Sequence, residues 1–113
     1  MATNQYKFYG TTLPTTDATT LLTPSAAGAG AVETFIIKSF RVTNNTGNTP
    51  TITITNNDIN IVNTQTLVAN ASTEILTLPL IVESSKSIKV TMSSADSVSI
   101  GISYLNITQE VTI

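Results

Sequence analysis

The chain has 113 residues, of which Thr, Ile and Val supply 43, while His, Cys and Trp are absent. Five basic and seven acidic residues give a net charge of −2. The length predicts one domain with its own hydrophobic core, and the β-branched residues favour strands. The missing residue types exclude a histidine base, a cysteine nucleophile and a disulfide, and the few scattered Lys and Arg residues argue against a nucleic-acid partner.

The first predicted element is an aromatic strand at residues 5–10, with the sequence QYKFYG. The period of a strand places Tyr6 and Phe8 on one face and Tyr9, with Lys7, on the other. We expect Tyr6 and Phe8 to cap the core of the domain. In the alternative, one or more of these rings fills a pocket on a neighbouring subunit, because aromatic side chains anchor many protein interfaces.

Small and polar residues dominate the next segment, residues 11–31 (TTLPTTDATTLLTPSAAGAGA). Because few large apolar side chains are available to offset the entropy of ordering, the segment is typical of an extended arm. Leu21 and Leu22 are the exception and predict a short strand within it. We therefore divide the chain into a strand plus arm at residues 1–31 and a β-sandwich domain at residues 32–113. The sandwich is expected to remain folded when residues 1–31 are deleted.

From residue 32 onward, apolar and polar residues alternate, as in strands with one buried and one wet face. Lys38 interrupts the first apolar set. The sets expected to face the core are Ile36, Phe40 and Val42; Ile52 and Ile54; Ile59 and Ile61; Leu76, Leu78 and Leu80; Ile88, Val90 and Met92; and Val98, Ile100, Ile102 and Tyr104.

Turn-forming Asn, Asp, Gly and Ser residues separate these sets at short intervals. Pro79 falls inside a strand pattern, which predicts an edge strand or a bend. No window of useful length keeps the helical period. The sequence therefore predicts an all-β fold, an antiparallel two-sheet β-sandwich of the jelly-roll or immunoglobulin-like type, with about seven or eight strands.

Oxygen-rich residues at Asn57, Asp58 and Asn60 superficially resemble a calcium-binding loop, but the closing bidentate glutamate is missing at the required spacing. We interpret them as a turn between two strands. Serine is plentiful, yet no G-x-S-x-G motif occurs. We expect a protein that is not an enzyme and that has no catalytic residue, metal or cofactor.

A resemblance to a known class of proteins rests on several segments. They are TLLTP at residues 20–24, VETFIIKSFRVTNNTG at 32–47, EILTLPLIVE at 74–83 and SIKVTMSSADSVSIGISYLNIT at 87–108. In this order they resemble small β-sandwich virion proteins of tailed bacteriophages, the head decoration or cement proteins. The resemblance covers residues 20–108.

This resemblance implies a mechanical function, in which copies bind the major capsid protein or other virion proteins and brace the head shell. It also implies a homo-oligomer, favouring a trimer, located in the virion after synthesis in the host cytoplasm. No signal peptide or membrane-spanning run is visible. A tail, fibre or head-fibre component and a carbohydrate-binding β-sandwich are the alternatives. The candidate partner-binding residues are Tyr6, Phe8, Tyr9, Leu21 and Leu22.

Overall fold

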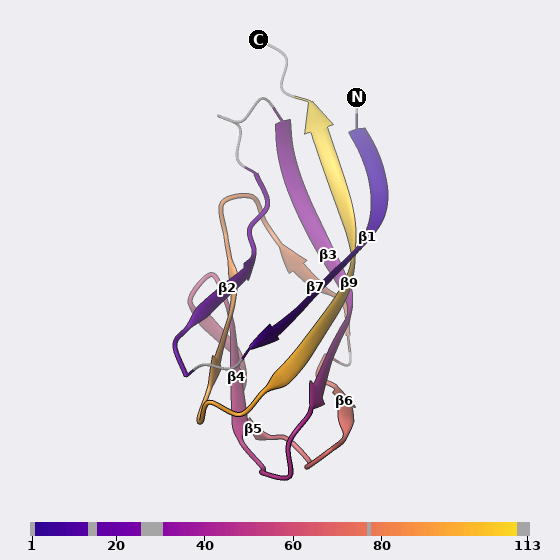
Figure 1. Cartoon of the computed structure of the whole chain (residues 1–113). Coiled ribbons are helices and arrows are strands. Elements are labelled where there is room, and N and C mark those ends of the chain that lie inside the picture. Colours follow the sequence, from indigo (N-terminus) through magenta and orange to yellow (C-terminus); the bar gives the residue numbers. More distant parts are fainter. Residues whose placement is uncertain (1, 14–15, 26–30, 77, 111–113) are drawn as a thin grey trace.

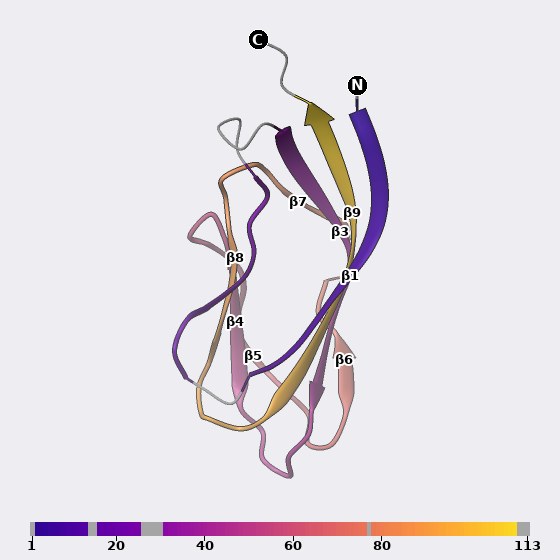
Figure 2. The same cartoon turned by 45° about the horizontal axis from the view of Figure 1, so that its top comes forward.

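A computed structural model of the protein describes residues 2–13, 16–25, 31–76 and 78–110. All regular secondary structure in these ranges is β-strand. The strands are β1 (Ala2–Leu13), β2 (Thr19–Leu22), β3 (Ala31–Asn44), β4 (Thr51–Asn56), β5 (Ile59–Thr66), β6 (Ser72–Glu74), β7 (Leu80–Val82), β8 (Ile88–Met92) and β9 (Val98–Glu110). They form two antiparallel sheets packed face to face (Figures 1 and 2), which confirms the predicted all-β sandwich.

The order of the strands is that of a jelly roll. One sheet has the order β1-β9-β3-β6, with β7 also paired to β3, and the other has the order β2-β8-β4-β5. β6 and β7 share one edge of β3, because β6 pairs with residues 41–43 and β7 with residues 35–37. If these two short strands count as one position, the strands pair from the two ends of the chain inward. The pairs are β1 with β9, β2 with β8, β3 with β6 and β7, and β4 with β5. A long hairpin wound around itself gives this order, whereas an immunoglobulin domain has a different one.

β1 and β2 belong to these sheets, which corrects the expectation of a separate arm. Every residue of β1 has a partner in β9, from Ala2 opposite Gln109 to Leu13 opposite Val98. β2 pairs with β8 in the other sheet. The stretches 14–15 and 26–30 of the expected arm lie outside the described residues.

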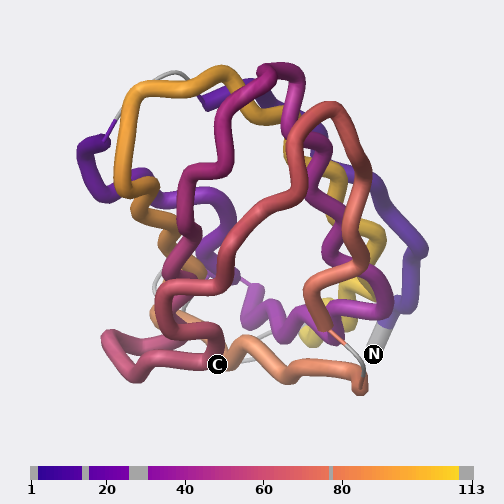
Figure 3. Tube along the Cα trace, turned by 90° about the horizontal axis from the view of Figure 1, so that it is seen from below, coloured from indigo at the N-terminus to yellow at the C-terminus, as the bar shows by residue number. Residues whose placement is uncertain are grey.

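The core lies between the two sheets, which form two facing walls when the molecule is viewed from below (Figure 3). The expected inward residues of β4, β8 and β9 are all buried, which confirms those three sets. The largest fully buried side chains are Phe40, Ile37, Ile52, Ile54, Leu67, Ile88, Ile100, Ile102, Val42, Val82, Val90 and Val98.

A β-bulge changes the phase of β3. Ile37 lies opposite Tyr104 and Ser39 lies opposite Ser103, so Lys38 is an extra residue with no counterpart in β9. An extra residue shifts the inward face by one position. The prediction that Ile36 shares the inward face with Phe40 was therefore wrong: Ile37 points into the core before the bulge and Phe40 after it.

Two further apolar sets do not fully follow the prediction. Ile59 and Ile61 are exposed, because β5 is the edge of its sheet and its register against β4 is broken by two irregularities. Leu78 is exposed as well, and it lies between β6 and β7. Leu76 and Leu80 of the same predicted set are partly buried and pack against the core, in agreement with the prediction. Pro79 immediately precedes β7, in agreement with the predicted bend or edge.

Candidate functional site

The five-stranded sheet has an outer face, which is turned away from the four-stranded sheet. On β9 the even-numbered residues from Val98 to Tyr104 are buried, so the odd-numbered residues point outward. Ser99, Gly101 and Ser103 lie along the lower part of this face, and Leu105 and Ile107 along the upper part. In Figure 1 the upper parts of β1, β3 and β9 reach beyond the rest of the molecule, toward the end where both termini lie.

A row of apolar side chains crosses this outer face. Tyr6 lies opposite Leu105, Leu105 lies opposite Ile36, and Ile36 lies opposite Ile81. Residues directly opposite each other on one face of a sheet are in contact distance, so the four side chains form one continuous strip, which we call the apolar band. Its two ends are the most open, with Tyr6 79% and Ile81 58% exposed. The band stands out against the part of the outer face below it, where β9 and β3 carry mainly serine, threonine and glycine: Ser99, Gly101, Ser103, Ser39 and Thr43.

The apolar surface continues around the edge of the sandwich. Ile59, Ile61 and Ile81 together line a shallow hollow of about 320 Å³. Ile59 is 64% exposed. The side chains that were expected in the core at β5 thus extend the apolar band onto a second side of the molecule. Contiguous exposed apolar surface of this kind marks interaction sites in soluble proteins.

Tyr6 and Phe8 do not cap the core. Leu13 is buried on the inward face of β1 and Tyr9 packs against the core, so residues of the opposite parity point outward. Phe8 is 70% exposed, and its ring lies over Gly10 and Gly101. These two glycines are directly opposite each other on β1 and β9. Their missing side chains leave the space that the ring occupies.

Leu21 and Leu22 are both buried, which corrects the expectation that they are available to a partner. Two consecutive inward side chains require an irregular strand, and the register of β2 against β8 shifts between Thr20 and Leu22. Of the five candidate partner-binding residues, Tyr6 and Phe8 are thus exposed on the outer face, while Tyr9 is half-buried. Sequence reasoning missed Leu105, Ile36 and Ile81, because their alignment depends on strand order and because the bulge breaks the alternation that would have placed Ile36 outward.

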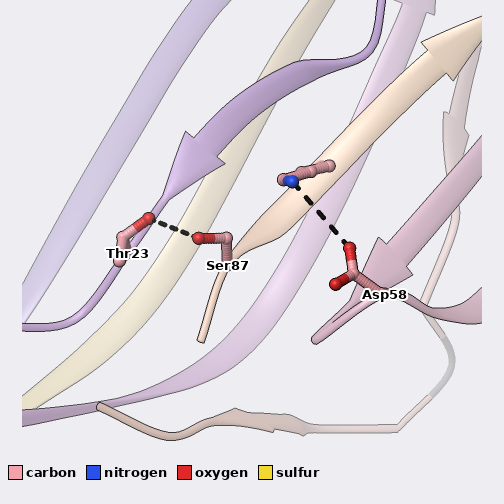
Figure 4. Close-up of polar contacts among 4 residues, drawn as sticks. Thr23, Asp58 and Ser87 are labelled. Atoms are coloured by element: carbon pink, nitrogen blue, oxygen red, sulfur yellow. Dashed lines mark hydrogen bonds and ion pairs between the residues drawn. The ribbon is translucent and has the colours of Figure 1, made fainter. Parts of the chain in front are cut away.

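Of the three residues that resemble a calcium-binding loop, Asn57 and Asp58 form the turn that the sequence predicted, and Asn60 lies in β5. Asn57 and Asp58 both have positive φ angles, 54° and 62°, and they join β4 to β5 as a two-residue hairpin loop of type I′. The Asp58 carboxylate lies 3.8 Å from the Lys89 ammonium, and the hydroxyls of Thr23 and Ser87 are hydrogen-bonded nearby (Figure 4). Both groups of the ion pair are exposed, so it contributes at most about 1 kcal/mol. The described residues contain no cluster of three or more acidic, histidine or cysteine side chains.

Glu33 ties the projecting part of the sheet to the chain segment that follows β2. Its carboxylate accepts a hydrogen bond from the Asn106 amide (2.8 Å) and another from the backbone N–H of Ser25 (3.0 Å). Burial by itself raises the pKa of Glu33. The hydrogen bonds from Asn106 and Ser25, together with the nearby charge of Lys7, outweigh it and hold the pKa below its ordinary value.

A lowered pKa in the folded state stabilises the fold above the ordinary pKa of the carboxyl group, and this stabilisation is lost as the pH falls through the folded-state value. We expect Glu33→Gln to lower the free energy of unfolding by up to about 1 kcal/mol at neutral pH, because solvent screens the partly exposed carboxylate, and to differ little from the natural protein near pH 3. Urea unfolding followed at both pH values measures this. Glu83→Gln is the control, because Glu83 is exposed and its side chain has no hydrogen bond or ion pair among the described residues. An equal loss at both pH values would contradict a role for the Glu33 charge.

No helix within the described ranges has the length and apolar character needed to cross a membrane. Neither a protein-family model nor a curated protein sequence matches this chain.

Proposed function

We propose that this protein is a non-enzymatic virion structural protein that decorates a bacteriophage capsid and docks through the apolar band. The observation that carries the proposal is the unbroken apolar row Tyr6, Leu105, Ile36 and Ile81, which crosses four neighbouring strands on the outer face. A domain of 113 residues has a complete core without these side chains. Their exposure therefore lowers the solubility of the protein without stabilising its fold, and this favours a role in binding another protein.

The low charge of the chain supports docking of this kind. A net charge of −2 on 113 residues produces little repulsion between neighbouring copies. Covering one exposed tyrosine or isoleucine contributes roughly 1.5–3 kcal/mol, so a single band gives a modest affinity. A shell with many equivalent positions multiplies such contacts, and an oligomer, for which we propose a trimer, engages several at once.

The jelly-roll order adds a fold-level analogy. Jelly rolls occur in viral capsid domains and in lectins, and a fold alone assigns no function. The capsid partner itself is proposed from the resemblance of residues 20–108 to decoration proteins. The apolar band contributes the surface on which the docking is built.

Binding to capsids that lack the protein tests the proposal. We expect the purified chain to co-sediment with such capsids and to raise their resistance to heat. Ile81→Asp should weaken binding by about tenfold or more, since it replaces a covered apolar side chain with a charge. Val68→Asp is the matched control, because Val68 is 62% exposed but lies near the loop around Asn44, far from the band.

Three results separate the alternatives. Equal binding by the Ile81 and Val68 variants would remove the band from the docking surface. Failure of the natural chain to bind capsids would overturn the decoration proposal, and binding to isolated tails instead would favour a tail component. Sedimentation equilibrium of the free protein measures whether it is a trimer.

A further inference from the structure

Below the apolar band, the outer face carries a hollow of about 700 Å³ that three strands line. This volume lies within the range of small-molecule sites. A row of residues crosses the sheet at this point, in which Gly10 lies opposite Gly101 and Gly101 lies opposite Arg41. The two adjacent positions without side chains leave space for an aromatic ring, and the long cationic side chain of Arg41 comes next in the row.

The Phe8 ring covers the two glycines and lines the base of the hollow. A Cβ atom at Gly10 would lie 2.9 Å from a Phe8 ring carbon, and one at Gly101 would lie 3.1 Å from another. The ring thus rests on the glycine backbone, while most of its surface is exposed. An aromatic face carries partial negative charge. It therefore favours an apolar ligand surface whose C–H groups point toward it, such as one face of a pyranose ring.

The guanidinium of Arg41 is a positive charge without an ion-pair partner among the described residues. It is exposed, and the described residues place no carboxylate within ion-pair distance of it. Its cross-strand neighbour Glu74 instead accepts hydrogen bonds from the Ser39 hydroxyl and the Phe40 N–H. A guanidinium in this state is suited to a planar anion, because it can donate two parallel hydrogen bonds to a carboxylate.

Hydroxyl groups complete the lining. Ser103 lies opposite Phe8, and Thr12 lies one step beyond Gly10 on the same face. Neither hydroxyl has a hydrogen-bond partner among the described residues. A hydroxyl both donates and accepts, and sugar hydroxyls have the same capacity.

We infer that this hollow binds one ring of an acidic saccharide, with the pyranose face on Phe8 and the sugar carboxylate on Arg41. The inference goes beyond the proposed docking function and uses different residues. A jelly roll that docks through the apolar band would present this second site close beside it, on the lower part of the same face.

The test is an NMR titration of the whole isotope-labelled protein with tetragalacturonic acid, and with maltotetraose as the neutral saccharide of equal length. We expect the amide signals of Gly10, Gly101 and Ser103 to move with the acidic saccharide. Arg41→Gln should raise the dissociation constant for it by about tenfold or more, while Lys89→Gln, a charge removed from the other sheet, should leave it unchanged.

Gly101→Ala separately tests the role of the Phe8 ring, which rests on Gly101. The added methyl group displaces the Phe8 ring, which is the movable end of a flexible side chain, so the fold should persist and saccharide binding should fall. Binding of maltotetraose as tight as that of the acidic saccharide would overturn the role of Arg41. Signal changes that do not include Gly10 and Gly101, or no change at all, would overturn the site. None of these outcomes depends on capsid docking, which is measured through Ile81.

Discussion

Deletion of residues 1–31 is expected to leave a chain that does not fold. β1 covers the outer edge of β9 along its whole length, from Ala2 to Leu13, and β2 covers the edge of β8. The deletion also removes the buried side chains of Leu13, Leu21 and Leu22. Losing one buried leucine costs about 2–5 kcal/mol. The loss of three is therefore comparable to the whole free energy of unfolding of such a domain, which is usually about 5–15 kcal/mol.

Circular dichroism, amide signal dispersion and urea unfolding of the 32–113 fragment measure this result. Deletion of residues 1–5 is the control. Thr3, Asn4 and Gln5 are exposed on the projecting end of the sheet, so the shorter deletion should remain folded with a small loss of stability. A cooperatively unfolding 32–113 fragment would show that β1 and β2 are dispensable, as an independent arm would be.

The sequence predicted the central strands well because their two faces have different chemistry. Val98, Ile100 and Ile102 alternate with Ser99 and Gly101, and only one register buries the apolar set. The predicted sets in β4, β8 and β9 are confirmed for this reason. The turn at residues 57–58 was predictable from local chemistry alone, since Asn and Asp tolerate positive φ angles.

The edges were not predictable from alternation. Ile59 and Ile61 alternate with Asn60 as a buried strand would, yet β5 is an edge strand and they are exposed. Leu21 and Leu22 are both buried only because β2 is irregular where it pairs with β8. In each case the pairing and register of an edge strand decide burial, and both depend on residues far apart in the chain.

The candidate site was predictable only in part. The sequence indicates an aromatic cluster that includes Tyr6 and Phe8, but alternation along one strand favours the core for these rings and does not place them on the outer face. The apolar band can be predicted only if β1, β9, β3 and β7 are known to be neighbours in that order. Strand order is set by the whole fold, and no segment of the sequence contains it.

Paired one-residue deletions in β3 are expected to differ sharply in their effect. Deleting Ile37 leaves Lys38 between Ile36 and Ser39. If Phe35 and Phe40 then keep their inward positions, the Lys38 ammonium takes the place of a fully buried isoleucine. The lost isoleucine costs about 2–5 kcal/mol, and the buried charge adds further cost. We expect this variant to be largely unfolded, or to lose at least about 5 kcal/mol.

Deleting Lys38 instead should be tolerated. Ile37 and Ser39 already lie opposite the consecutive residues Tyr104 and Ser103, so removal of the extra residue restores unbroken alternation from Phe35 to Val42. We expect a change in the free energy of unfolding of about 1 kcal/mol or less, close to that of the surface substitution Lys38→Ala. Urea unfolding of the three variants measures the difference.

On the edge of β3 away from β9, the bulge lies where the paired strand changes from β7 to β6. Just beyond the bulge, the Glu74 carboxylate accepts a hydrogen bond from the Phe40 N–H. If the bulge were needed for that change of partner, deletion of Lys38 would be as damaging as deletion of Ile37. A small effect would instead show that Lys38 is an inserted residue that the strand absorbs. The apolar band would then stay aligned in the Lys38 deletion, because Ile36 and its partners Leu105 and Ile81 lie on the unshifted side of the bulge. Capsid binding by that variant should therefore match that of the natural protein.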